Sequence, residues 1–234
     1  MKAMMRILLP ALLSFGIASG AQSQNPPLPS KDAVFVVTYV DVTLAAASRA
    51  VGLLQHYHDA LAASGNSSVE LFQELGQPDH FVIAEQWPDR AGFEAQKQGQ
   101  AAAQLLTALK DMESAPPDSH VFQGYAIGPV KPPAGGRARV WGFSHFEIPA
   151  ARLGQFDALA KPFVEASRSD PGLIRFDILQ EASPRQNQFT IIEGWSSPQA
   201  AEAHRTSVHS EKFREGLASM LVGPFDDRLY GKFN

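Results

Sequence analysis

Cysteine is absent from this sequence of 234 residues. Disulfides, zinc sites with thiolate ligands, iron–sulfur clusters and a cysteine nucleophile are therefore all excluded. Basic charge is also scarce, because 20 Lys and Arg residues stand against 24 Asp and Glu residues and leave a formal charge of −4. Such a chain has no basic field to neutralise phosphates, so a nucleic-acid partner is not expected. Any catalysis must use oxygen, nitrogen or aromatic groups.

The apolar run near the N-terminus is short. It extends from Ile7 to Ala18, whereas a transmembrane helix needs about 20 residues. Two basic residues precede it and small residues at 19–21 offer a cleavage site, which is the pattern of a secretory signal peptide. We therefore expect residues 1–21 to be removed and the protein to be periplasmic or secreted, without stable membrane insertion. An uncleaved anchor or a buried first helix is the alternative.

The rest of the chain contains the same unit twice. Glu85-Gln86-Trp87 aligns with Glu193-Gly194-Trp195 at an offset of 108 residues, and the alignment continues without a gap to Asp118 over Asp226. Between the copies, residues 128–138 have the proline and glycine content of a linker. The sequence thus predicts a proline-rich tether over 22–32, an N-terminal domain over 33–127 and a C-terminal domain over 139–234.

Both copies show the same order of expected elements. Branched and aromatic residues indicate strands, apolar periodicity indicates helices, and Ser197-Pro198 is a helix start. In the second copy we expect a strand over 140–148, a helix from Pro149, strands over 173–179 and 188–195, one helix from Pro198 to Gly223-Pro224, and a strand over 227–233. This βαββαβ order is that of a ferredoxin-like unit.

A ferredoxin-like sheet has helices on one face and a bare apolar face on the other. Two fused copies can cover each other's bare faces. We therefore expect an α+β protein in which two βαββαβ units pack sheet to sheet as an internal pseudo-dimer. Further homo-oligomerisation stays open.

The second copy carries a series of short motifs. They are Glu193-x-Trp195 at the end of the third strand, then Ala203-His204, His209 and Phe213, and finally Arg228-Leu229-Tyr230. This pattern resembles the antibiotic biosynthesis monooxygenase (ABM) domain family of dimeric α/β barrels, and the resemblance covers nearly the whole mature chain, once per copy. It implies that the two units form an internal dimeric α/β barrel.

The resemblance also implies an activity. Family members resemble quinol and phenol monooxygenases that act on a small aromatic substrate and dioxygen, with no metal, flavin or haem cofactor. Haem degradation, found in other relatives, fits poorly. No asparagine occurs in residues 140–148, and Arg214 stands where the haem-ligating histidine is expected.

Three histidines, His145, His204 and His209, are the candidate catalytic residues. An imidazole with a reference pKa near 6.5 is suited to proton transfer. In the first copy Gln96 and Ala101 replace the last two, so we expect the active site mainly in the C-terminal unit. The alternative is that both are solvated residues on a helix surface.

Six further residues are candidates for substrate binding: Trp195, Phe143, Trp141, Arg175, Tyr39 and Trp87. Strand alternation places Trp141, Phe143 and His145 on one face, and Tyr39 at the corresponding position of the first copy. Purely structural roles are the alternatives for these residues. The tryptophans that end strands can be core residues, and Arg175 can pair with Asp177 on its own strand face.

A metal site at His204 and His209 is not expected. Five residues along a helix turn about 500°, which leaves the two side chains roughly 140° apart. Chelation would need a helix break, which Thr206-Ser207 can provide, and no acidic or thiolate partner stands at ligand spacing.

The rival function is a non-catalytic protein that binds or scavenges a small aromatic ligand. The first copy has lost both histidines, so a unit without the chemistry is tolerated in this chain.

Overall fold

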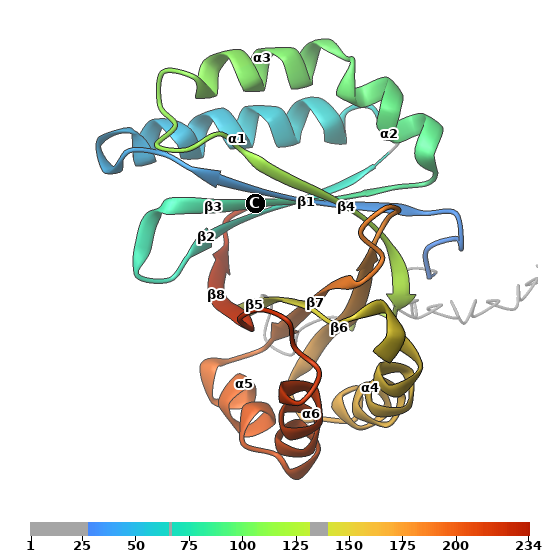
Figure 1. Ribbon diagram of the computed structural model, residues 1–234. Helices are drawn as coiled ribbons and strands as arrows, with labels where there is room; N and C mark the ends of the chain where they lie inside the picture. Colours follow the sequence, from blue (N-terminus) through green and yellow to red (C-terminus); the bar gives the residue numbers. More distant parts are fainter. Residues whose placement is uncertain (1–27, 66, 132–139) are drawn as a thin grey trace, which may run out of the picture.

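Two βαββαβ units follow one another in the computed structural model, as the repeat predicts (Figure 1). The structure describes residues 28–65, 67–131 and 140–234. The expected signal peptide, much of the tether and most of the linker lie outside these residues. Within the described part of the chain, no helix is long and apolar enough to cross a membrane.

The elements of the first unit are β1 (Val34–Asp41), a 3₁₀ turn (Leu44–Ala46), α1 (Ala47–Ala62), β2 (Ser68–Glu74), β3 (Gln77–Trp87), α2 (Arg90–Lys97), α3 (Gln100–Leu109) and β4 (Asp118–Ala126). Those of the second are β5 (Val140–Glu147), a 3₁₀ turn (Ala150–Arg152), α4 (Leu153–Ser167), β6 (Leu173–Glu181), β7 (Gln188–Trp195), α5 (Pro198–Arg205), α6 (Val208–Ala218) and β8 (Asp226–Lys232).

The expectation of one continuous helix after Ser197 is wrong, because the chain forms two helices with a break at Thr206–Ser207. Hydroxyl groups satisfy backbone atoms on both sides of the break. Thr206 Oγ1 donates to the carbonyl of Glu202 at 2.9 Å, and Ser207 Oγ accepts from the amide of Ser210 at 3.3 Å. Such local bonds compete with the helix ladder and favour helix ends. The first unit breaks at the same place, before Gly99, the N-cap of α3.

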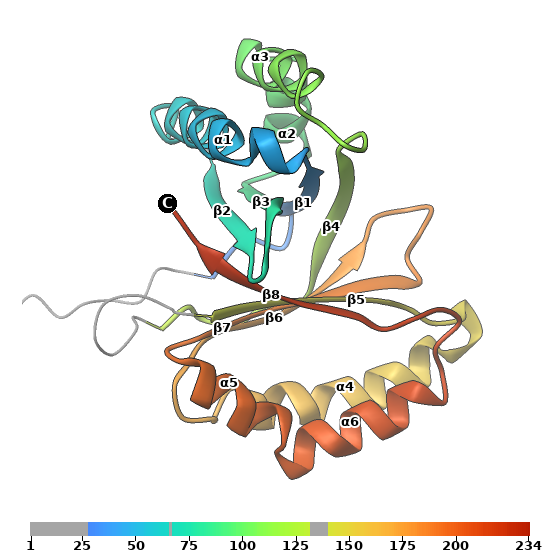
Figure 2. The same cartoon turned by 90° about the vertical axis from the view of Figure 1, so that its left-hand side faces the viewer.

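The eight strands close into one barrel in the order β1-β3-β2-β8-β5-β7-β6-β4. The last strand of each unit joins the two sheets. β4 pairs with β1 and with β6, and β8 pairs with β5 and with β2. Figure 2 shows the helices of each unit on the outer side of the strands. The internal pseudo-dimer is therefore confirmed, and the sheets share an unbroken ladder as well as a packed interior.

Three apolar layers fill the molecule. One lies between the first sheet and its helices, and a second lies between the second sheet and its helices. The third fills the barrel, where Phe72 contacts Trp141 and Phe143 with ring centroids 5.2 and 5.0 Å apart. Because side chains alternate along a strand, each β5 residue belongs either to the barrel or to the helix side.

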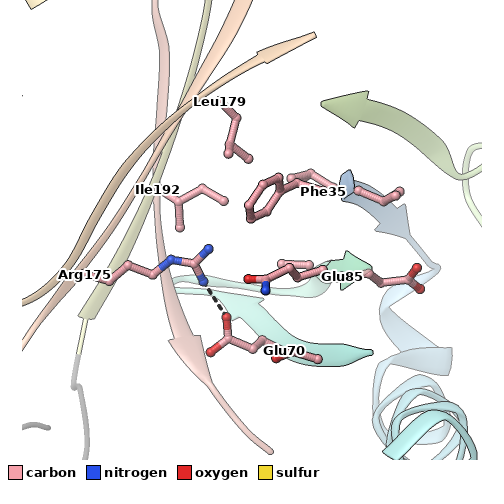
Figure 3. Close-up of a pocket in the computed structure, with 11 residues that line it drawn as sticks. Phe35, Glu70, Glu85, Arg175, Leu179 and Ile192 are labelled. Atoms are coloured by element: carbon pink, nitrogen blue, oxygen red, sulfur yellow. Dashed lines mark hydrogen bonds and ion pairs between the residues drawn. The ribbon is translucent and has the colours of Figure 1, made fainter. Parts of the chain in front are cut away.

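A buried ion cluster links the two units at one end of the barrel. Arg175 of β6 donates through Nε to Asp177 Oδ2 at 2.6 Å. Through Nη1 it donates to Glu70 Oε2 at 2.7 Å, across to β2 (Figure 3). Lys232 Nζ reaches the other Glu70 oxygen at 2.8 Å. One cavity beside Arg175, between the two sheets, is about 20 Å³, room for about one water molecule. A second, of about 280 Å³, lies at the barrel end beside Arg175, Asp177 and Glu70. The ion pair expected on this strand face is confirmed, and it also reaches the other unit.

Removal of Arg175 should destabilise the fold strongly. Arg175→Ala leaves Asp177 without its cation and Glu70 with Lys232 alone, in a site where the arginine is 8% exposed, so the free energy of unfolding should fall by about 3–5 kcal/mol. Arg90→Ala, which breaks an exposed pair with Glu94 and a contact with the Phe93 ring, should cost less than about 1 kcal/mol. Urea unfolding followed by tryptophan fluorescence measures both, and equal small losses would contradict the role of the cluster.

Candidate active site

A cavity of about 450 Å³ lies between the second sheet and its helices. Its polar wall contains Glu193 of β7, His204 of α5 and Ser210 of α6. Its apolar wall is formed mainly by Phe163, Phe176, Ile191, Trp195, Phe213 and Phe225. A concave, mainly apolar space with a few converging polar groups is the usual form of a small-molecule site.

His204 is held at the cavity wall by a carboxylate. Its Nδ1 lies 2.7 Å from Asp170 Oδ2, in the turn before β6. A carboxylate accepts hydrogen bonds, so in a neutral imidazole that donates to Asp170 the proton is on Nδ1 and Nε2 is an acceptor. Nε2 lies 3.2 Å from Ser210 Oγ and 3.7 Å from Glu193 Oε2, both of which line the cavity. Burial lowers the pKa of His204, which favours the neutral ring.

Glu193 is the carboxyl group at the wall that lies nearest to His204 Nε2, and Glu202, Arg205, Arg214 and Asp227 also line the cavity. Burial raises its pKa to about 7, and the charges of Asp227 and Asp170 add to the rise, although the indole of Trp195 opposes it by donating to Oε2 at 2.9 Å. The Trp195 ring also packs against His204, with centroids 4.8 Å apart. Two proton-exchanging groups thus face one aromatic cavity.

The first unit shows the same site in a closed form. Tyr57 corresponds to Phe163, and its hydroxyl donates to Glu85 Oε1 at 2.7 Å. Val36 pairs with Glu85 in the position that Gly142 takes opposite Glu193. Val36, Tyr57 and Trp87 are all buried in the core of the first unit. The second unit therefore has an open cavity where the first has packed side chains.

The predicted site residues fall into separate places. His204 and Trp195 line the cavity, and His209 Nε2 reaches Asp170 Oδ2 at 2.9 Å just outside it. Trp87 is buried under the helices of the first unit.

The other candidates lie on the barrel side of the sheets. Phe143, Trp141 and Tyr39 pack in the barrel core, and Arg175 belongs to the ion cluster. His145 Nδ1 lies 3.0 Å from Thr190 Oγ1, and its ring is 5.4 Å from that of His120. The structure does not bring His145 together with His204, because β5 turns it to the opposite face from Gly142.

Sequence reasoning missed Asp170 and Ser210 and did not assign a role to Glu193. Glu193 left a signal, since the Glu-x-Trp motif recurs at Glu85. Asp170 left only the turn-forming Asp-Pro-Gly sequence. Its closeness to both histidines arises from tertiary structure.

Comparison with protein-family models bears on this site. The model described as antibiotic biosynthesis monooxygenase matches residues 33–107 and 144–216, together more than half of the chain. The chain belongs to this family. The two matches confirm the tandem duplication of the ABM domain.

Solved structures share the whole fold of this tandem ABM chain. A "Putative monooxygenase" from Fusobacterium nucleatum superposes with a TM-score of 0.73 over 86% of this chain and 93% of its own, at 10% identity. An anthrone oxidase-like protein does so with a TM-score of 0.69 over 89% and 95%, at 13% identity. At these identities the likeness concerns the fold alone.

One curated relative is similar in sequence. The uncharacterized protein sll1783 of Synechocystis is 29% identical over 76 residues, which are 32% of this chain and 51% of that protein. The match thus spans about half the length of the relative.

Displacing Glu193 from the cavity wall should weaken ligand binding in the second ABM domain. A Cβ on Gly142 would lie 2.8 Å from Glu193 Cγ, so Gly142→Val, which copies Val36, should weaken the affinity for 1-naphthol at least tenfold by calorimetry. Gly154→Ala is the control, since a Cβ there meets nothing within 4 Å. Unchanged affinity in Gly142→Val would place the ligand elsewhere.

Proposed function

We propose that this chain is a monooxygenase that oxidises a phenol or quinol with dioxygen in the cavity of its second unit, without a cofactor. The observation that carries the proposal is the Asp170–His204 pair, which presents Nε2 to an aromatic cavity beside Glu193. Membership of the ABM family and the closed state of the first unit support the same assignment. The substrate's own electrons drive the reaction.

The first step is removal of the phenolic proton. His204 Nε2 accepts it, and the carboxylate of Asp170 stabilises the imidazolium through Nδ1–H. The phenolate lies against the rings of Trp195 and Phe213, which exclude water and make its charge more available for electron transfer. Glu193 and Ser210, both close to Nε2, can relay the proton.

The second step uses dioxygen. The phenolate gives one electron to O₂, and the resulting phenoxyl radical and superoxide combine at a ring carbon that carries hydrogen, forming a peroxide. Return of the proton from His204 and loss of the ring hydrogen break the O–O bond and release water. Phenol and O₂ thus give quinone and water, and both atoms of O₂ and all electrons are accounted for without an external reductant.

Oxygen uptake tests the assignment. We expect the full mature chain to consume O₂ with one or more members of a panel of hydroquinones and polycyclic phenols, and His204→Ala to reduce kcat by about 10²–10⁴. Gln96→Ala, the matched change in the closed first unit, should leave the rate unchanged.

Two results would count against the enzyme. One is no uptake above buffer with any member of the panel, and the other is an equal rate in His204→Ala. Tight binding of an unconverted phenol, seen as a rise in melting temperature, would instead support a protein that binds or scavenges aromatic ligands.

We also propose that the chain is exported, because its first 21 residues have the pattern of a signal peptide. Protein recovered from the periplasm or medium should begin at Gln22 by N-terminal sequencing. An intact Met1 in cytoplasmic protein alone would contradict export.

A further inference from the structure

We infer that Asp170, His204 and His209 form a binding site for a divalent transition-metal ion such as Zn²⁺, outside the cavity and behind the imidazole that faces it. Three donor atoms converge there, namely Asp170 Oδ2, His204 Nδ1 and His209 Nε2, all within 4.8 Å of one another. Two imidazole nitrogens and one carboxylate oxygen are a common ligand set for such ions, with one position left for water.

The break between α5 and α6 makes this convergence possible. In a continuous helix, side chains five residues apart point roughly 140° apart. Here the turn at Thr206–Ser207 re-aims α6, and the rings of His204 and His209 have centroids 5.4 Å apart. The expectation that these histidines diverge therefore fails together with the continuous helix.

The first unit has the same break and none of the ligands. Gln96 and Ala101 replace the two histidines, and no acid occurs from Ala60 to Ser67, the segment that corresponds to the Asp170 turn. The break thus belongs to the fold, whereas the three donors occur together in one copy only. If the three donor residues were required only to form the helix break, we would expect them in both copies.

The surroundings of Asp170 suit a cation. Among the described residues, its only ion-pair partners within 4 Å are His204 and His209, and no Lys or Arg neutralises it. The side chains of Asp170 and His209 are 19% and 24% exposed, so an ion and its water can enter from solvent.

The fit needs only small movements. Asp170 Oδ2 lies 2.7 and 2.9 Å from the two nitrogens, whereas donors around a four-coordinate Zn²⁺ are roughly 3.4 Å apart. The second shell is present too, because a metal-bound imidazole typically donates its other N–H to an oxygen. His204 Nε2 has Ser210 Oγ at 3.2 Å and Glu193 Oε2 at 3.7 Å for this purpose.

An ion at Nδ1 would change what His204 offers the cavity. A neutral imidazole has one lone pair, so a metal on Nδ1 moves the proton to Nε2 and makes that atom a donor. His204 Nε2 can then no longer accept the phenolic proton. This consequence rests on the proposed function, and it predicts that Zn²⁺ inhibits oxygen uptake and that EDTA restores it.

Metal titration tests the site directly. The full mature chain, without a histidine tag and after EDTA treatment, should bind one Zn²⁺ by calorimetry and give the visible band of four-coordinate Co²⁺. His209→Ala and Asp170→Asn should each weaken binding at least 100-fold. His145→Ala is the control, since it removes a histidine from the other imidazole pair, with His120, and should bind as the parent does.

The outcomes separate the two proposals. Absence of binding in the parent, retained binding in a folded His209→Ala variant, or loss of binding in His145→Ala would each overturn the metal site. His209 is partly exposed, so its variant decides the matter even where Asp170→Asn unfolds. One bound Zn²⁺ without loss of oxygen uptake would support the site and contradict only the role of His204 as base.

Discussion

The inner face of each sheet is largely apolar and, in the described part of the chain, the opposite sheet covers it, so each unit needs the other. The duplication meets that need within one polypeptide. The pairing of β4 and β8 joins the sheets further. Each of these strands pairs within its own unit and also with a strand of the opposite unit. Closure leaves no free sheet edge and fixes the relative position of the units.

Closure of the barrel also decides where a ligand can bind. Phenylalanine and tryptophan side chains fill much of the interior, and the cavity between the sheets beside Arg175 has room for about one water. A wider cavity of about 280 Å³ lies at the barrel end, beside Arg175, Asp177 and Glu70. The cavity of about 450 Å³ lies instead in the layer between the second sheet and its helices. In the first unit Tyr57 and Val36 are buried in the corresponding layer. The first copy has a packed core where the second has a cavity, a difference that duplication allows because either copy can change while the other keeps the fold.

The sequence was sufficient for the fold because its signals are local or repeated. Strand alternation indicates the strands, Ser197-Pro198 indicates a helix start, and the 108-residue offset indicates the repeat of the whole unit. These three signals are consistent with one fold. The helix break at Thr206–Ser207 was visible only as a pair of capping residues within an apolar period. The pairing of β4 with β6 and of β8 with β2 has no local signal. A strand shows the same alternation of residues whichever neighbour it pairs with.

The site was less predictable for the same physical reason. His204 and Trp195 belong to a motif that the sequence shows, and both line the cavity. His145 has the same imidazole group as His204, but the alternation of side chains along β5 places it on the barrel side. Asp170 lies in an Asp-Pro-Gly sequence that is fully accounted for by a turn. Nothing near it in the sequence indicates that it contacts two histidines 34 and 39 positions away.

Asp170 also links the two properties proposed for this site. A proton and a metal ion compete for the same lone pair on His204 Nδ1, and the carboxylate favours either of them because both bring positive charge. With the proton in place, Nε2 is free to accept from a phenol. With the ion in place, the tautomer reverses and Nε2 can only donate. The charge on one turn residue therefore holds the imidazole in either state, and the ligand on Nδ1 determines which tautomer faces the cavity.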